Sequence, residues 1–176
     1  MDLVEIRIPP EPFDPAKYKI AGIDSVVDEA AGTITMRAVV VPLDPGEAEA
    51  IRAQIAADKV AAINAERDHR LGMGAPYAGK RVEVSDRGRA DLGGMVSAAM
   101  LASNGLTAWS EGYARGWIAM DNERVPLPTP NDGILLAAFV GDWYGRTMQH
   151  ARDLKDAALT AVDPATIDEM AGWPDV

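Results

Sequence analysis

The sequence predicts an α+β fold in which a small antiparallel β region precedes a connecting amphipathic helix and a compact α+β domain. Two observations support this prediction. Alternation of apolar and polar residues is confined to the first 41 residues and a few short segments after residue 80, whereas apolar residues three or four apart recur over long stretches. We therefore divide the chain into an N-terminal β attachment region (1–45), a connecting helix (46–70) and a C-terminal domain (71–176).

Composition narrows the class of function. The chain has 176 residues, a formal net charge of −10 and a pI near 4.6, which argues against binding to nucleic acids or to anionic membranes. It contains no cysteine, so disulfides, thiolate nucleophiles and cysteine metal sites are excluded. No stretch approaches 18 apolar residues and no signal peptide is recognisable, so we expect synthesis in the cytoplasm and no membrane insertion.

The N-terminal region is predicted to contain three strands. Val4–Ile8 alternates and is ended by Pro9–Pro12, and residues 18–27 and 33–41 form two antiparallel strands around a turn. The last strand becomes wholly apolar after Ala38. Burial on both faces or against a partner chain would explain this change, and an ordinary core strand is the alternative, so Val39 and Val41 are candidate attachment residues.

Residues 47–70 are predicted to form an amphipathic helix with a thin, alanine-rich apolar stripe. Two uses of this stripe remain open. It can associate with other copies of the chain, in which case the candidate contact residues are Ile51, Ile55 and Ile63, or it can pack against its own subunit.

The C-terminal domain is predicted to begin with a flexible connector, residues 71–79, and a strand, 80–84, that pairs with a hairpin at 117–127. A helix follows Ser85. Thr129, Pro130 and Asp132 mark the start of a long helix, because they suit its cap, first position and first turn. A short helix at 165–170 ends the domain. The apolar stripe of the long helix comprises Leu136, Val140, Trp143, Thr147, Ala151, Leu154, Ala158 and Val162.

One aromatic cluster has the composition of a recognition patch. Trp109, Tyr113 and Trp117 recur every four residues in a stretch rich in glycine and serine, with Arg115 between them. Exposed aromatic faces of this kind stack on sugars or bases. The alternative is that these aromatic residues close a small sheet over its helices.

The sequence predicts no catalytic residue, no cofactor and no metal site. The nucleophile-elbow, phosphate-loop and zinc-protease motifs are all missing from the sequence. Asp121 is the best candidate for a carboxylate with a raised pKa, but a turn formed with Asn122 explains it more simply. We therefore expect that the protein is not an enzyme.

From Arg67 to Pro174 the chain resembles an uncharacterised domain family of tailed phages and prophages, encoded near tail-fibre and tail-assembly genes. The sequence departs from the family pattern at Ala119 and Met120. The matching pieces are Arg67-x-x-Arg70-Leu71, Tyr77-x-Gly79-Lys80, Trp117-x-x-x-Asp121-Asn122, Ala151-Arg152-x-Leu154-Lys155 and Ile167-Asp168-x-x-x-Gly172-Trp173-Pro174.

The resemblance brings no catalytic residues and implies a place in the virion. On this basis we expect a structural component of a bacteriophage tail, located at the tail tip, baseplate or tail fibre. Its expected partners are other tail proteins and further copies of itself, in a copy number related to a trimer or hexamer, and a host receptor or glycan is a further expected partner. The alternative is a tail-fibre assembly chaperone that leaves before the virion is complete.

Overall fold

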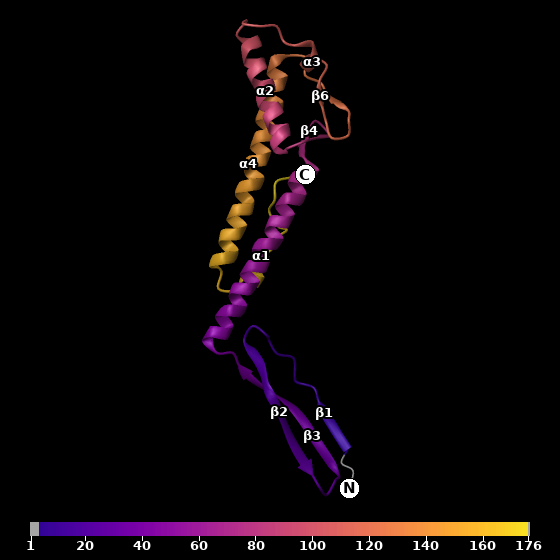
Figure 1. Cartoon of the computed structure of the whole chain (residues 1–176), viewed down its shortest axis with the longest axis vertical. Helices are drawn as coiled ribbons and strands as arrows, with labels where there is room; N and C mark the ends of the chain where they lie inside the picture. Colours follow the sequence, from indigo (N-terminus) through magenta and orange to yellow (C-terminus); the bar gives the residue numbers. More distant parts are fainter. Residues whose placement is uncertain (1–3, 176) are drawn as a thin grey trace. The chain divides into compact units, whose positions relative to one another are not determined.

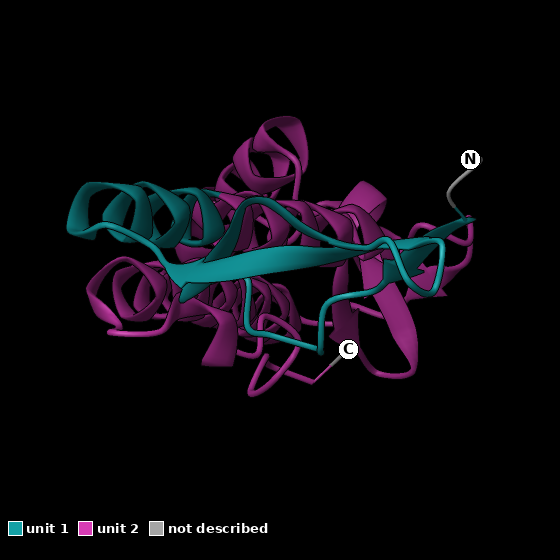
Figure 2. Cartoon of the chain, turned by 90° about the horizontal axis from the view of Figure 1, so that it is seen from below, with its two compact units in different colours: residues 1–57 teal, residues 58–176 magenta. Residues whose placement is uncertain are grey.

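The computed structural model describes residues 4–175 and confirms the α+β class. The chain forms two compact units, which we call unit 1 (residues up to Ala57) and unit 2 (residues from Asp58). Figure 1 labels the helices and strands, and Figure 2 colours the two units. The division falls inside helix α1 (Pro45–Met73), whereas the boundaries predicted from sequence fall at residues 45 and 70.

Unit 1 is built on a three-stranded sheet in the order β1-β3-β2. Its strands are β1 (Val4–Ile8), β2 (Tyr18–Asp28) and β3 (Thr33–Pro42). β2 and β3 form the predicted antiparallel pair, with a bulge between Ile20 and Gly22. β1, however, runs parallel to β3, so the expectation of a purely antiparallel region was wrong. Residues 9–17 cross the end of β3, and this crossing sets β1 parallel to it.

Helix α1 begins with a reciprocal cap that lies within unit 1. The Asp44 carboxylate accepts a hydrogen bond from the backbone N–H of Glu47 at 2.9 Å, and the Glu47 carboxylate accepts one from the backbone N–H of Asp44 at 3.1 Å. The first of these bonds is the main reason that the pKa of Asp44 lies below its usual range. Glu47 also pairs with Lys19 of β2, so the start of α1 is tied to the sheet.

Unit 2 holds two separate strand pairs, β4–β5 and β6–β7, and two long helices that lie side by side, α2 and α4 (Figure 1). Its elements after α1 are β4 (Ala75–Tyr77), β5 (Lys80–Val82), α2 (Asp86–Ser103), α3 (Glu111–Ala114), β6 (Trp117–Ile118), β7 (Arg124–Val125), α4 (Pro130–Thr160) and a 3-10 turn, η1 (Pro164–Thr166).

The strand pairing of unit 2 differs from the prediction. Residues 71–79 were expected to be a flexible connector, but they contain β4, and β5 pairs with β4 rather than with the hairpin at 117–127. The cause is a two-residue turn in which Ala78 and Gly79 both have positive φ, as hairpin turns of type I′ require. A hydrogen bond of 2.9 Å from the Met120 N–H to the Arg81 carbonyl still joins β5 to the segment that follows β6.

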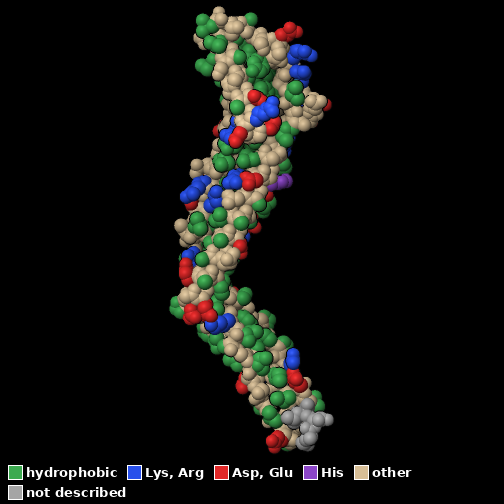
Figure 3. Space-filling model, in the orientation of Figure 1, with side chains coloured by type: hydrophobic (Ala, Val, Ile, Leu, Met, Phe, Trp, Pro, Cys, Tyr) green, Lys and Arg blue, Asp and Glu red, His purple; other side chains and the backbone are tan. Residues whose placement is uncertain are grey.

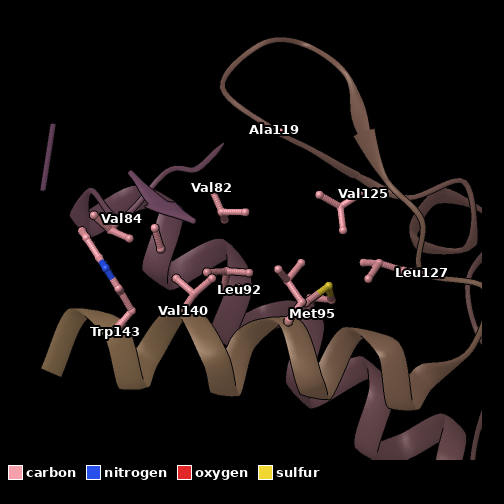
Figure 4. Close-up of a cluster of buried hydrophobic side chains, with 11 residues drawn as sticks. Val82, Val84, Leu92, Met95, Ala119, Val125, Leu127, Val140 and Trp143 are labelled. Atoms are coloured by element: carbon pink, nitrogen blue, oxygen red, sulfur yellow. The ribbon is translucent and has the colours of Figure 1, made fainter. Parts of the chain in front are cut away.

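The main core of unit 2 lies between α2, α4 and the strands (Figure 4). Trp143 is its largest side chain and is 1% exposed. The stripe predicted for α4 is confirmed at its six fully buried positions: Leu136, Val140, Trp143, Thr147, Ala151 and Ala158. The prediction was wrong at Val162, which is 95% exposed, because the helix ends at Thr160.

A second, smaller cluster joins the end of the chain to unit 2. Ile63, Ala151, Ala158 and Trp173 form it. The Trp173 indole packs edge-on against the ring of His150 at 4.8 Å, and the guanidinium of Arg70 lies 5.2 Å from its centroid. The short helix expected at 165–170 is replaced by the 3-10 turn η1, in which the N–H groups of Thr166 and Ile167 donate hydrogen bonds to the carbonyls of Asp163 and Pro164.

Candidate functional site

The predicted recognition patch is organised around α3 and the strand that follows it. Trp109 and Tyr113 stack with their centroids 5.2 Å apart and their planes at 22°. The Trp109 indole N–H donates a hydrogen bond of 3.0 Å to the Leu127 carbonyl, and the Ser110 hydroxyl accepts one from the Tyr113 N–H. The Trp109 ring is therefore fixed by a hydrogen bond inside unit 2, and the Tyr113 ring stacks on it.

Trp117 is held by the β6–β7 pair, where it lies opposite Val125. The preceding Gly116 has φ of +104°, and a Cβ atom there would lie 2.6 Å from the Val125 carbonyl oxygen. Glycine is therefore required for this close approach. Trp109, Tyr113 and Trp117 are all half-buried and pack against the main core, which is the arrangement expected if they close the sheet over the helices.

Three members of the patch nevertheless line an open cleft. Tyr113, Arg115 and Trp117 contribute to a cleft of ≈ 1140 Å³ between the start of α2 and the α3–β6 segment, and Trp109 does not. Among the described residues, the Arg115 side chain forms no hydrogen bond or ion pair. The lining also includes two further arginines and two carboxylates: Arg87, Arg124, Glu83 and Asp91. A ligand with an apolar ring face and hydroxyl or charged groups is complementary to this lining.

Asp121, the carboxylate singled out from the sequence, lies in the turn between β6 and β7. It accepts a hydrogen bond of 2.9 Å from the Glu123 N–H and lies 3.1 Å from the Lys80 ammonium. These two interactions hold its pKa below the usual range, the backbone hydrogen bond being the larger cause. A general acid needs the opposite shift, so the geometry of Asp121 is that of a turn residue.

Neither a metal cluster nor a membrane span is found in the part of the chain that the structure describes. Residues 4–175 contain no group of three or more His, Asp or Glu side chains placed to hold a metal ion. Within the same range, every helix is too short or too polar to cross a membrane. Nε2 of His150 lies 2.9 Å from the Ala171 carbonyl oxygen, so this imidazole contacts the terminal segment.

The candidate attachment residues have different surroundings. Ile63 is fully buried in the second cluster of unit 2, so its assignment to a surface for self-association is corrected. The periodicity of the helix could not distinguish burial within the subunit from burial between subunits. Ile51, Ile55 and Val41 are half-buried, and Val39 is 40% exposed. These four residues all belong to unit 1.

The sheet of unit 1 also exposes apolar residues that sequence reasoning missed. The strand register assigns its side chains to two faces, which we name the Ile23 face and the Val26 face after an exposed residue on each. The Ile23 face carries Tyr18, Ile20, Ile23, Val27, Ile34, Met36, Ala38 and Val40. The Val26 face carries Val4, Ile6, Ile8, Val26, Val39 and Val41. In Figure 3 hydrophobic side chains cover much of the visible surface of this sheet.

Comparison with known proteins identifies one family. A family model described as a domain of unknown function, DUF4376, matches residues 52–171, which is about two thirds of the chain. The match begins before Arg67, where the resemblance seen in the sequence starts, and it leaves out the whole sheet of unit 1. No functionally curated protein and no solved structure shows significant similarity to the chain. By the extent of the match, the chain belongs to the DUF4376 family.

Proposed function

We propose that this protein is a structural component of a bacteriophage tail, located at the tail tip, the baseplate or a tail fibre. Unit 1 anchors the chain, and unit 2 is the module that it presents. The observation that carries the proposal is the sheet of unit 1, which exposes large apolar side chains on both faces. Such surface marks a site of protein association in a soluble protein.

The extent of the family match supports the same division of roles. The match covers nearly all of unit 2 and stops short of the sheet. A family module joined to a separate association module suits a protein that attaches a common domain to a particular assembly. The ordered motifs from Arg67 to Pro174, which resemble a family encoded near tail genes, suggest that this assembly is a phage tail.

The test is quantitative mass spectrometry of purified particles of the phage that encodes the chain, with the major tail protein as the reference. We expect a small, fixed copy number that is a multiple of three or six. Ile23→Lys in the sheet should lower incorporation, whereas Val162→Lys, at an exposed valine of unit 2, should leave it unchanged. Absence of the wild-type chain from mature particles would overturn the proposal and favour the assembly chaperone.

A second candidate function, recognition of a host receptor or glycan, is favoured by the cleft that Tyr113, Arg115 and Trp117 line. Binding of the purified chain to a glycan array tests it. We expect Arg115→Ala to abolish the signal and Arg146→Ala, on the exposed side of α4, to retain it. An array without signal for the wild-type chain would reject this candidate for glycans.

A further inference from the structure

The sheet of unit 1 lacks a covering layer within its own unit. Nine large apolar residues of its strands are between 38% and 69% exposed: Val4, Ile6, Ile8, Tyr18, Ile20, Ile23, Val26, Val27 and Val39. They are distributed over both faces, so neither face is a conventional polar surface. A three-stranded sheet needs an apolar face packed against another layer to be stable. The sheet therefore requires cover from outside unit 1.

The exposed apolar area matches what a specific interface needs. A large aliphatic side chain carries about 60–120 Å² of apolar surface, so nine half-exposed residues leave on the order of 400 Å² uncovered. A standard interface buries about 800 Å² per partner, a little over half of it apolar. The exposed apolar area of one sheet therefore equals the apolar area that one partner buries in a standard interface. This area is divided between the two faces of the sheet.

The charges of the sheet permit contact between copies of this acidic chain. The three strands contain three acidic residues and three basic residues: Glu5, Asp24 and Asp28, with Arg7, Lys19 and Arg37. Their sum is zero, whereas the whole chain carries −10. Arg7 pairs with Glu5 and Lys19 with Glu47, and Asp24 lies opposite Arg37 in the register. Two such sheets each carry no net charge, so they do not repel each other when they come into contact.

The two faces also differ in shape and sequence. A hollow of ≈ 350 Å³ opens at the Ile23 face, lined by Ile23, Met36 and Ala38 with Arg7, Ile8 and Pro9. The Val26 face presents β-branched side chains, including Val26 at 63% exposure, of a size that fits such a hollow. A contact between unlike faces of identical subunits is heterologous, and it leaves one face of each terminal copy free until a ring closes.

We propose that the sheet of unit 1 is a self-association module, in which the Ile23 face of one copy packs on the Val26 face of the next to form a closed ring of three or more copies. Because each contact uses only half of the exposed apolar area, ring closure is what stabilises the assembly. This inference deepens the proposed function by naming the partner of unit 1, and it rests on that proposal only for the location in a tail.

The test is the mass of the full-length purified chain in solution, measured by size-exclusion chromatography with light scattering. The wild type should form a discrete species of three or more copies at micromolar concentration. Ile23→Lys and Val26→Lys should each weaken association by at least about tenfold, because every contact in the ring uses both faces. Ile23→Thr and Val26→Thr keep strand-forming side chains and should act in the same direction with a smaller effect.

Val162→Lys is the matched control, since it places the same charge at an exposed aliphatic position outside the sheet. It should retain the wild-type mass. All four tryptophans lie in unit 2, so an unchanged fluorescence spectrum shows that each variant keeps this unit folded.

Three results would overturn the inference. These are a monomeric wild type, a dimer, and an assembly that persists in either single-face variant. The outcome is separable from that of the proposed function. A ring in solution together with absence from phage particles would reject the tail location and keep the self-association, whereas a monomer found at fixed copy number in particles would do the reverse.

Discussion

The two units place their apolar side chains in opposite ways. Unit 2 encloses Trp143, Leu136 and Met95 almost completely between α2, α4 and the strands. Unit 1 has a regular, well-registered sheet, but its Ile23 and Val26 side chains are mostly exposed. Both units thus have regular backbone hydrogen bonds, but only unit 2 buries its large apolar side chains. The difference indicates that unit 2 is stabilised by its own core, whereas the apolar surface of the sheet is left uncovered within unit 1.

The largest expected effect concerns the core of unit 2. Trp143→Ala should lower the free energy of unfolding by about 3–5 kcal/mol, because it leaves a cavity in the main core and removes the hydrogen bond from the indole N–H to the Asp175 carbonyl. Urea denaturation followed by fluorescence of the remaining tryptophans measures it. Val162→Ala is the control and should change stability by less than about 0.5 kcal/mol. Equal effects of the two substitutions would contradict the described core.

The next effect concerns the start of α1 in unit 1. If the start of α1 adds to the contact made by the sheet, Ile51→Asp combined with Ile55→Asp should weaken self-association by at least about tenfold, since two charges would be added to half-buried apolar positions. Light scattering measures the mass, and tryptophan fluorescence checks that unit 2 stays folded. An unchanged mass would restrict the association surface to the sheet.

A smaller effect is expected at the start of α4. The Thr129 N–H and hydroxyl donate hydrogen bonds of 2.9 Å and 2.6 Å to the Asp132 carboxylate. Thr129→Ala removes the hydroxyl bond and keeps the N–H bond, and it should cost about 1 kcal/mol, the typical cost of replacing a threonine at an N-cap by alanine. Thr160→Ala, in the last turn of the same helix, is the comparison and should cost less. If urea denaturation gave the reverse order, the cap would not be stabilising.

The smallest effect is a dependence on pH. Hydrogen bonds from Thr129 hold the pKa of Asp132 below its usual range. Its contribution is therefore complete above the ordinary aspartate pKa, near 4, and is lost as the pH falls through the lowered value. Thermal unfolding between neutral pH and acid should show a steeper loss of stability for the wild type than for Asp132→Asn. Parallel curves would show that this carboxylate makes no contribution to the acid sensitivity.

Residues that favour a helix start made α4 predictable from sequence. The short strands of unit 2 have no comparable local signal, so their pairing was hard to predict. Thr129, Pro130 and Asp132 fixed the start of a helix whose stripe then identified six buried positions. β4 and β5 have three residues each, which is too short for alternation to be recognised, so the pairing between 80–84 and 117–127 was predicted wrongly.

The candidate site shows the same limit. Spacing identified Tyr113, Arg115 and Trp117, which line the cleft, but it could not reveal that α2 supplies the opposite wall. Periodicity marked Ile63 as apolar without showing that it is buried in one cluster with Ala151, Ala158 and Trp173. In β2, a bulge between Ile20 and Gly22 places Ile20 and Ile23 on the same face although they are three residues apart, and no local sequence signal predicted the bulge.

The second cluster of unit 2 has a consequence for synthesis. The cluster that contains Ile63 also contains Trp173, which is synthesised much later, whereas the sheet of unit 1 uses only residues before Leu43. Chains grow at roughly 5–20 residues per second and fold from the N-terminus, so the sheet can pair its strands while most of unit 2 is still unmade. Neighbouring nascent chains on one messenger RNA would therefore expose their sheets to each other before release. Completion of this cluster waits for the synthesis of Trp173, and a chain that stops before this residue would leave the cluster without its indole.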